Sequence, residues 1–353
     1  MTMTAPRTRF RRAPGSDAIE PPEAHGIARD AVKLLVARPD GVSHARFADL
    51  GDHLRPGDLL VVNNSATMPA AVNGHRDGWP VAVHFSTRRA DRSWVVELRP
   101  AGAAAGHLPD VRPGERIELP GGGALIVEAS YPQTGISGAR LWTARLILEG
   151  DVASYLARHG RPIRYSYVPR SWPLRYYQTV FARQPGSAEM PSAARPFSTE
   201  LVTALVAAGV AIAPITLHAG VSSAEAGEPP TPEPFAVPAA TARLVNLTRA
   251  TDGRVIAVGT TVTRALESAA TADGVVRQVD GWTHLVLGPD RPCRVVDGLI
   301  TGWHDAGASH LLLLEAVAGP ELVARAYREA MEHGYLWHEF GDSALLLPVP
   351  ATT

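Results

Sequence analysis

The sequence contains one cysteine, Cys293, in 353 residues. A single cysteine cannot form an internal disulfide, so no feature of the sequence points to an oxidising compartment, and we expect a cytoplasmic protein. A lone cysteine is more often a small apolar packing residue than a nucleophile, and we expect the packing role for Cys293.

Long hydrophobic runs are also missing. No apolar stretch approaches the roughly 20 residues that a membrane-spanning helix needs, so we expect no membrane interaction. Four arginines between Arg7 and Arg12 have no apolar segment behind them, which argues against a secretory signal, and we expect residues 1–19 to form a disordered arm. The net charge of −1 gives the whole chain no strong attraction to nucleic acid, although a local basic patch is compatible with it.

What the chain does have is enough apolar sequence for a substantial core, with 45% hydrophobic and 20% charged residues. Strand and helix patterns alternate on either side of a segment, residues 69–150, in which short strands are separated by glycine and proline. The first pattern is typical of an α/β domain and the second of a small β-barrel. We therefore expect a main α/β domain with a mixed sheet or barrel, formed by residues 20–68 and 151–353, and an inserted barrel-like β domain at 69–150.

Several element predictions depend on local pattern alone. The spacing of Phe47, Leu50 and Leu54 predicts a helix over residues 44–54. Pro214 predicts that the strand at 210–217 lies at a sheet edge or carries a bulge. Residues 222–238, rich in Ser, Glu, Gly and Pro, are expected to form an exposed loop. Further helices are expected at 151–159, 198–208, 239–249, 261–272, 309–318 and 321–333, and strands at 254–258, 284–287 and 344–347.

Two segments of the C-terminal half carry the strongest functional signal. In the first, Ala257 to Ser268, an apolar strand ends at Gly259-Thr-Thr261 and a helix begins, so backbone N–H groups and hydroxyls are presented at a strand end. The second, Val295 to His304, repeats an apolar run followed by a turn and an imidazole. Similar strand-end polar groups occur at Asn63-Asn64 and at His218.

These two segments resemble the S-adenosylmethionine:tRNA ribosyltransferase-isomerase family, which builds epoxyqueuosine on tRNA. Agreement continues at Tyr177–Val180 and in the strand that ends at Asn63. The resemblance implies a large mixed α/β domain with an inserted β domain, S-adenosylmethionine (SAM) as cosubstrate, and transfer and isomerisation of the ribosyl unit of SAM to a deazaguanine base in tRNA, with release of adenine and methionine. We expect no metal, because the remaining histidines lack the paired spacing of metal ligands. The oligomeric state cannot be read from it, and we favour a monomer.

The chemistry that the resemblance implies needs a base for the ribose C5′ proton, and histidine suits that task. Each candidate also has a structural alternative: a strand-end histidine, a helix cap, a turn cap, a packed tryptophan, or a surface ion pair between Arg264 and Glu267. The candidates are His304 and His218 for proton transfer; Gly259, Thr260, Thr261, Arg264, Glu267, Asp297, Trp303 and Asp342 for SAM; and Asn63, Asn64, Tyr177 and Gln178 for the acceptor.

The chain departs from the family pattern at several positions, four of which remove charged or imidazole groups. Asn64 replaces a carboxylate, Ala66 and Ala71 replace guanidinium groups, and Pro196 replaces an imidazole. Lost charge-assisted contacts favour a changed acceptor. Two alternatives therefore stay open at this point: a divergent enzyme that cleaves SAM and modifies a small molecule, with slow or no reaction on tRNA, and a non-enzymatic SAM- or RNA-binding protein.

Overall fold

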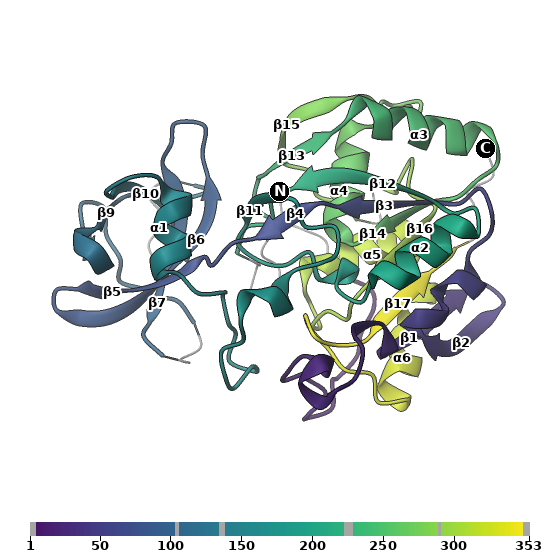
Figure 1. Ribbon diagram of the computed structural model, residues 1–353, viewed down its shortest axis with the longest axis horizontal. Coiled ribbons are helices and arrows are strands. Elements are labelled where there is room, and N and C mark those ends of the chain that lie inside the picture. Colours follow the sequence, from purple (N-terminus) through teal and green to yellow (C-terminus); the bar gives the residue numbers. More distant parts are fainter. Residues whose placement is uncertain (1–4, 103–105, 134–137, 222–228, 289–290, 349–353) are drawn as a thin grey trace.

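The computed structural model describes residues 5–102, 106–133, 138–221, 229–288 and 291–348. Within them the chain forms a large mixed sheet with helices on both faces and, at the left of Figure 1, a closed β-barrel. This is the mixed α/β class predicted from the sequence. None of the helices in the described part of the chain is both long and apolar enough to span a bilayer.

The large sheet has nine strands among the described residues, in the order β15-β13-β12-β3-β14-β16-β17-β1-β2. Its central strands β12, β3, β14 and β16 run parallel, whereas β17 is antiparallel to β16 and parallel to β1. Their bounds are β1 (Lys33–Arg38), β2 (Gly41–Arg46), β3 (Leu59–Asn63), β12 (Ala211–Leu217), β13 (Glu233–Val237), β14 (Val255–Val258), β15 (Val279–Thr283), β16 (Gly298–Thr301) and β17 (Ser343–Leu346).

Both faces of this sheet are buried because alternate residues of each strand enter two separate cores. In β1, Leu35 and Ala37 face one core and Leu34 and Val36 face the other. Helices α3 (Ala239–Ala250), α4 (Thr260–Ala269), α5 (Ser309–Ala318) and α6 (Pro320–Glu332) pack on the first face. The second face is covered by α2 (Thr199–Ala207) and by the 3₁₀ helices η3 (Phe47–His53) and η6 (Ser192–Ala194).

The barrel comprises β5 (Ala71–Arg76), β6 (Trp79–Arg88), β7 (Trp94–Pro100), β8 (Arg116–Glu118), β9 (Ala124–Tyr131) and β10 (Leu141–Ile147). Asp77 and Gly78 join β5 to β6 with positive φ values of 49° and 81°, the conformation of a tight hairpin turn. Helix α1 (Val152–His159) packs Tyr155 and Leu156 into the barrel core. The barrel strands lie inside the predicted insertion at 69–150, whose domain boundaries remain a prediction.

Short elements connect the two parts. Strands β4 (Ser65–Thr67) and β11 (Gln184–Ser187) pair in parallel between the large sheet and the barrel. The remaining 3₁₀ helices are η1 (Pro22–His25), η2 (Arg29–Ala31), η4 (Pro120–Gly122) and η5 (Leu174–Tyr177).

Four local predictions were wrong. Residues 44–54 form the end of β2 and the 3₁₀ helix η3, because an i, i+3 spacing also fits three residues per turn. Strand β12 lies in the interior of the sheet, between β13 and β3. Only the last two residues of β12, Thr216 and Leu217, pair with β13. Pro214 precedes this pairing, so its missing N–H costs no hydrogen bond to β13. Strand β13 lies within the predicted loop 222–238, of which residues 222–228 are outside the described part. The strand expected at 284–287 is replaced by β15 just before it.

The N-terminal segment also differs from the expected disordered arm. Its backbone N–H groups at Arg7 and Thr8 donate to the carboxylate of Glu315 at 3.2 and 2.7 Å. Phe10 packs on Tyr327 with ring centroids 4.7 Å apart. Residues 5–18 are therefore part of the folded main body. Residues 1–4 lie outside the described part.

Candidate active site

A cavity of about 620 Å³ lies between the large sheet and the barrel. The sheet side contributes the turn from β14 into α4 and the segment that follows β16, whereas the barrel side contributes β7 and the segment after α1. The volume is within the usual range for small-molecule sites, roughly 300–1,000 Å³. The two sequence segments with the strongest signal therefore meet in one cavity.

The turn from β14 into α4 forms one wall. Gly259 has φ of 101°, a value that favours glycine, and a Cβ there would lie 3.3 Å from the Cβ of Ala193. Thr260 and Thr261 follow it and also line the cavity. None of the described side chains caps this end of α4, so its first backbone N–H groups remain available to an anionic or polar ligand.

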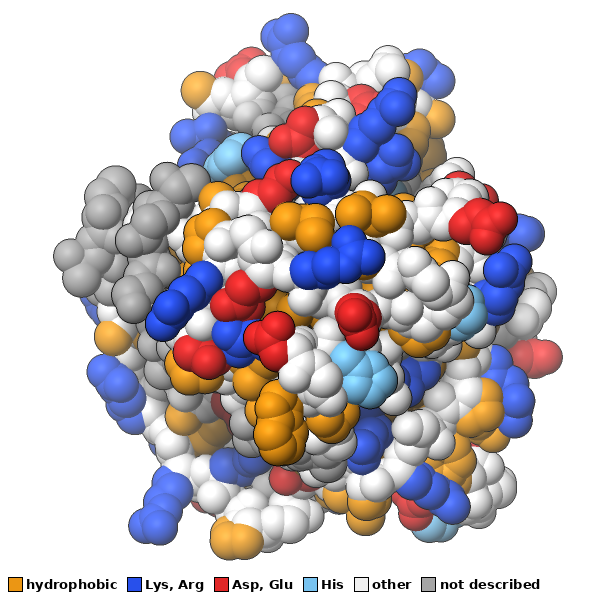
Figure 2. Space-filling model, turned by 90° about the vertical axis from the view of Figure 1, so that its left-hand side faces the viewer, with side chains coloured by type: hydrophobic (Ala, Val, Ile, Leu, Met, Phe, Trp, Pro, Cys, Tyr) orange, Lys and Arg blue, Asp and Glu red, His pale blue; other side chains and the backbone are white. Residues whose placement is uncertain are grey.

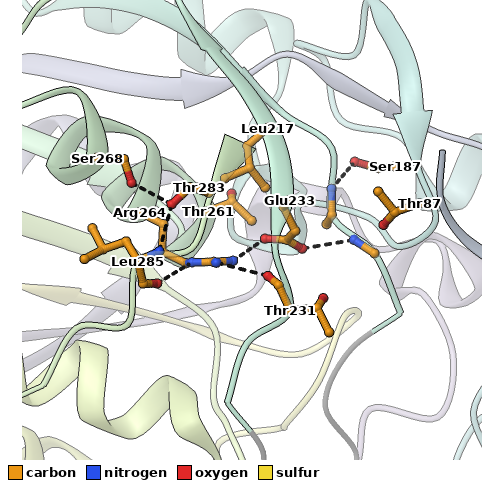
Figure 3. A network of polar contacts seen from close by, with 12 residues as sticks. Thr87, Ser187, Leu217, Thr231, Glu233, Thr261, Arg264, Ser268, Thr283 and Leu285 are labelled. Carbon is orange, nitrogen blue, oxygen red and sulfur yellow. Dashed lines mark hydrogen bonds and ion pairs between the residues drawn. The ribbon is translucent and has the colours of Figure 1, made fainter. Parts of the chain in front are cut away.

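Arg264 lies one turn further along α4 and is buried at the cavity wall. Figure 3 shows its guanidinium ion-paired with Glu233 and hydrogen-bonded to the carbonyl oxygens of Leu285 and Thr231, with N···O distances to the carbonyls of 3.1 and 3.2 Å. Glu233 also accepts a hydrogen bond from the N–H of Gly220 at 3.0 Å. Burial raises the pKa of Glu233, and the charge of Arg264 opposes that shift. Arg264 thus fixes β13 and residue 285 around the cavity.

His304 lines the cavity at the end of the second segment. Its Nε2 lies 3.1 Å from Oγ1 of Thr301, and its backbone N–H donates to the hydroxyl of Tyr327 at 3.1 Å. His310 stacks on it, with centroids 4.5 Å apart and an interplanar angle of 3°. Burial, followed by the nearby His310 and His338, lowers the pKa of His304 well below its ordinary value. The imidazole is therefore neutral at neutral pH and able to accept a proton.

We expect this histidine pair to make stability fall in mild acid. Burial lowers the pKa of His310 to about 4, whereas an unfolded histidine titrates near 6.5. Below pH 6.5 the unfolded chain therefore binds protons that the folded site does not, so the free energy of unfolding should decrease as the pH falls toward 4 and level off below it. Urea titrations at several pH values would measure this. His310→Gln should flatten the dependence, and the exposed His75→Gln should not; equal slopes for all three proteins would contradict the assignment.

Two aromatic candidates, Trp303 and Tyr177, line the cavity. Trp303 packs against Tyr327, Tyr335 and Trp337 with centroids 5.0 to 5.7 Å apart, and its indole N–H has no partner among the described residues. Tyr177 is 4% exposed, and its hydroxyl likewise has no partner there. Burial raises the pKa of Tyr177, so the hydroxyl stays protonated and can donate to a ligand.

His218 is not among the residues that line this cavity. Its Nδ1 lies 2.7 Å from Oγ of Ser65, which in turn lies 2.6 Å from Oγ of Ser187. Its ring packs so closely on Gly186 that a Cβ there would lie 2.4 Å from Nδ1. The two candidate histidines therefore have separate surroundings, and His218 holds the β4–β11 connection.

The three carboxylates that we expected to bind SAM accept hydrogen bonds from backbone N–H groups. Glu267 accepts from the N–H groups of residues 294–296 at 2.9 to 3.1 Å rather than pairing with Arg264. Asp297 accepts from the N–H of Val255 at 2.8 Å. Asp342 accepts from the backbone N–H groups of Lys33 and Leu336 at 2.7 and 2.8 Å. None of these carboxylates lines the cavity, so the structure places them in the positions of turn and strand caps.

Three of the four acceptor candidates are likewise occupied by protein contacts. The side-chain amide of Asn63 donates to the carbonyl oxygen of Leu217 at 2.8 Å and accepts from the N–H of Leu217 at 3.1 Å. Asn64 accepts from the hydroxyl of Thr216 at 2.7 Å. The side-chain amide of Gln178 accepts from the N–H of Thr67 at 3.0 Å and donates to the carbonyl oxygen of Thr67 at 2.8 Å. These amides fix strands near the cavity but do not line it.

Other polar residues of the cavity were not identified from the sequence. Besides Glu233 and His310, they include Tyr167, whose hydroxyl donates to Glu339 at 2.6 Å and whose ring stacks on His338 at 4.0 Å. Burial raises the pKa of Glu339. These residues come from segments distant in the chain, and a single tyrosine or glutamate outside a motif carries no signal of such a pairing.

The expected absence of a metal remains a prediction. Among the described residues, His44, Glu329 and His333 place possible ligand atoms within 4.8 Å of one another. None of the three lines the cavity.

Known proteins give a consistent comparison. The family model described as queuosine biosynthesis protein matches residues 9–346. An S-adenosylmethionine:tRNA ribosyltransferase-isomerase from Moorella thermoacetica is 36% identical over 95% of this chain and 97% of the relative, and one from Symbiobacterium thermophilum is 37% identical over 90% and 94%. The crystal structure of S-adenosylmethionine tRNA ribosyltransferase from Thermotoga maritima covers 96% of this chain and 99% of its own, with a TM-score of 0.53 and 26% identity. On this agreement in sequence and fold, the chain belongs to the S-adenosylmethionine:tRNA ribosyltransferase-isomerase family of queuosine biosynthesis proteins.

Proposed function

We propose that this protein cleaves SAM and transfers and isomerises its ribosyl unit onto a deazaguanine base in tRNA, releasing adenine and methionine. The observation that carries the proposal is the meeting of the Gly259–Arg264 turn and His304 in one cavity of about 620 Å³. Full-length similarity to enzymes named for this reaction supports it.

SAM binds, in this proposal, along the sheet side of the cavity. The free N–H groups at the start of α4 and the hydroxyls of Thr260 and Thr261 offer donors to its polar ends. Arg264 acts as a positioning residue, because its guanidinium already bonds Glu233 and two carbonyls. This assignment replaces a direct clamp on the methionine carboxylate.

His304 is the proposed base for the ribose C5′ proton. The lowered pKa keeps the imidazole neutral at neutral pH, which is the protonation state that a base needs, and the contact with Thr301 orients the ring. His310 stacks on the same ring. Tyr177 and the Tyr167–Glu339 pair face the same cavity and provide polar groups for the acceptor base.

The two alternative functions are not favoured. The relatives that match over nine-tenths of this chain carry one enzyme name, which argues against a non-enzymatic binder. A changed, small-molecule acceptor was inferred from the replacements at Asn64, Ala66, Ala71 and Pro196. The same relatives give that acceptor no support.

The proposed reaction is tested with SAM labelled with ¹³C in the ribose and an RNA hairpin that carries the deazaguanine precursor. We expect the label to appear on the RNA nucleoside by mass spectrometry, in equal amount to the adenine and methionine released. Parallel reactions with the free deazaguanine base test the small-molecule acceptor. Adenine release with label on the free base and none on RNA would overturn the tRNA assignment.

A further inference from the structure

A second, small hollow adjoins the catalytic cavity on the barrel side. It has a volume of about 30 Å³ and shares Arg99 and Ser166 with the larger cavity. Three arginines line it, from the barrel strand β7 and from the segment after α1. The lining residues that matter here are Ala71, His84, Arg99, Arg161, Arg164 and Ser166.

Positive charge in this hollow exceeds negative charge. No carboxylate belongs to the described residues that line it. Glu97 lines the larger cavity, and several groups share its carboxylate, which contacts Arg99 and Arg140, each at 3.1 Å, and lies 3.3 Å from Nδ1 of His84. Burial lowers the pKa of His84, so this ring adds no charge at neutral pH. One carboxylate thus faces several guanidinium groups.

Two of the arginines have no acidic partner in the described part of the chain. Arg164 donates to the carbonyl oxygen of Val168 at 2.7 Å. The side chain of Arg161 has no hydrogen-bond or ion-pair partner there, and burial together with the like charge of Arg164 lowers its pKa. Guanidinium groups that are half-buried side by side without a carboxylate are costly unless an anion joins them.

We propose that this hollow binds a phosphate group carried by the acceptor, held by Arg161 and Arg164 with help from Arg99 and Ser166. The inference rests on the proposed function, since it places the phosphate beside the cavity in which the acceptor base reacts. The phosphate belongs to an RNA phosphodiester next to the modified nucleotide or to a free nucleotide.

The surrounding surface does not provide the same chemistry. Figure 2 shows Lys and Arg side chains spread over the barrel end of the molecule, with Asp and Glu side chains among them. The hollow differs because two of its arginines, Arg161 and Arg164, line it together and have no acidic partner among the described residues. Arg161 also pairs through its backbone with Ala71, at 2.9 Å in both directions. This pairing fixes the backbone of Arg161 beside the barrel strand β5, at the edge of the hollow.

The test is binding of the RNA hairpin to the full-length protein, measured by fluorescence anisotropy. Arg161→Gln and Arg164→Gln should each weaken RNA binding about tenfold or more. Each should also reduce the slope of log K against log salt concentration by roughly the amount expected for one phosphate contact. Arg158→Gln is the matched control, because Arg158 is exposed on α1 three residues before Arg161. Calorimetric SAM binding should be equal in all four proteins.

Two further arms identify the source of the phosphate. In one, hairpins carry a single neutral methylphosphonate on either side of the deazaguanine nucleotide; one position should weaken binding to the unmodified protein and not to Arg161→Gln. In the other, the deazaguanosine 5′-monophosphate competes with RNA, and its effect is compared with that of the nucleoside. A difference in either arm supports the phosphate site and names its source.

Equal binding of RNA and of the monophosphate by the unmodified protein and both variants would overturn the inference. Because these assays measure binding, they are independent of turnover. If the hollow binds phosphate but no label reaches RNA, the proposed reaction fails and the phosphate site stands. If label is transferred equally by all variants at limiting RNA, the phosphate site fails and the reaction stands.

Discussion

Replacing Arg264 by methionine should lower the free energy of unfolding by about 3–5 kcal/mol, the usual cost of leaving one partner of a buried ion pair alone. The reason is that Glu233 would remain a buried carboxylate whose one remaining partner among the described residues is the N–H of Gly220. Urea denaturation monitored by tryptophan fluorescence measures the change. Arg243→Met, an exposed arginine of α3, should alter stability by no more than about 0.5 kcal/mol.

A double variant separates the lost pairing from lost packing. Arg264→Met combined with Glu233→Gln removes both charges while leaving an amide oxygen that can accept from Gly220, so it should recover much of the lost stability. A double variant as unstable as the sum of the two single variants would show that the ion pair is not the stabilising element. SAM binding by the double variant then reports whether Arg264 acts by position or by direct contact.

His304→Gln should reduce turnover by about 10²- to 10⁴-fold, the range for loss of a general base, while SAM affinity changes little. Glutamine can still contact Thr301 but cannot take up a proton, so the loss should appear in kcat rather than in KM. The control is His333→Gln, which lies beyond the end of α6 and does not line the cavity. Adenine release within tenfold of the unmodified protein would remove His304 from the role of base.

The comparison with His218 sharpens this assignment. His218 contacts Ser65 and packs on Gly186, outside the residues that line the cavity. A variant at this position should act mainly through the β4–β11 connection and therefore shift stability and KM more than kcat. The two histidines looked equivalent in sequence, and only their surroundings distinguish them.

The alternation of apolar runs with helical spacing predicted the α/β class because the parallel strands are buried on both faces. Helix α5 occupies the predicted residues 309–318, whereas β13 was missed because proline and glutamate in residues 222–238 look like loop sequence. Glu233, the first residue of β13, forms an ion pair with Arg264, which lies 31 positions further along the chain. Pairings across such separations leave no local pattern.

The candidate site was predictable where it depends on a continuous turn. Gly259, Thr260 and Thr261 are neighbours in the chain, and the structure places them together at the cavity wall. The carboxylates were not predictable in the same way, because a carboxylate after a strand caps backbone as readily as it binds ribose. Glu267 and Asp297 both take the capping role in this protein.

The crystal structure of the protein with SAM, or with the products adenine and methionine, tests the central claim most directly. We predict ligand density in the cavity between the β14–α4 turn and His304, with the ribose C5′ within hydrogen-bonding range of the imidazole, roughly 3 Å. Arg264 should keep its contacts with Glu233 while the ligand is bound. Density for the ribose and sulfonium at another place in the molecule, with this cavity filled by water, would contradict the account.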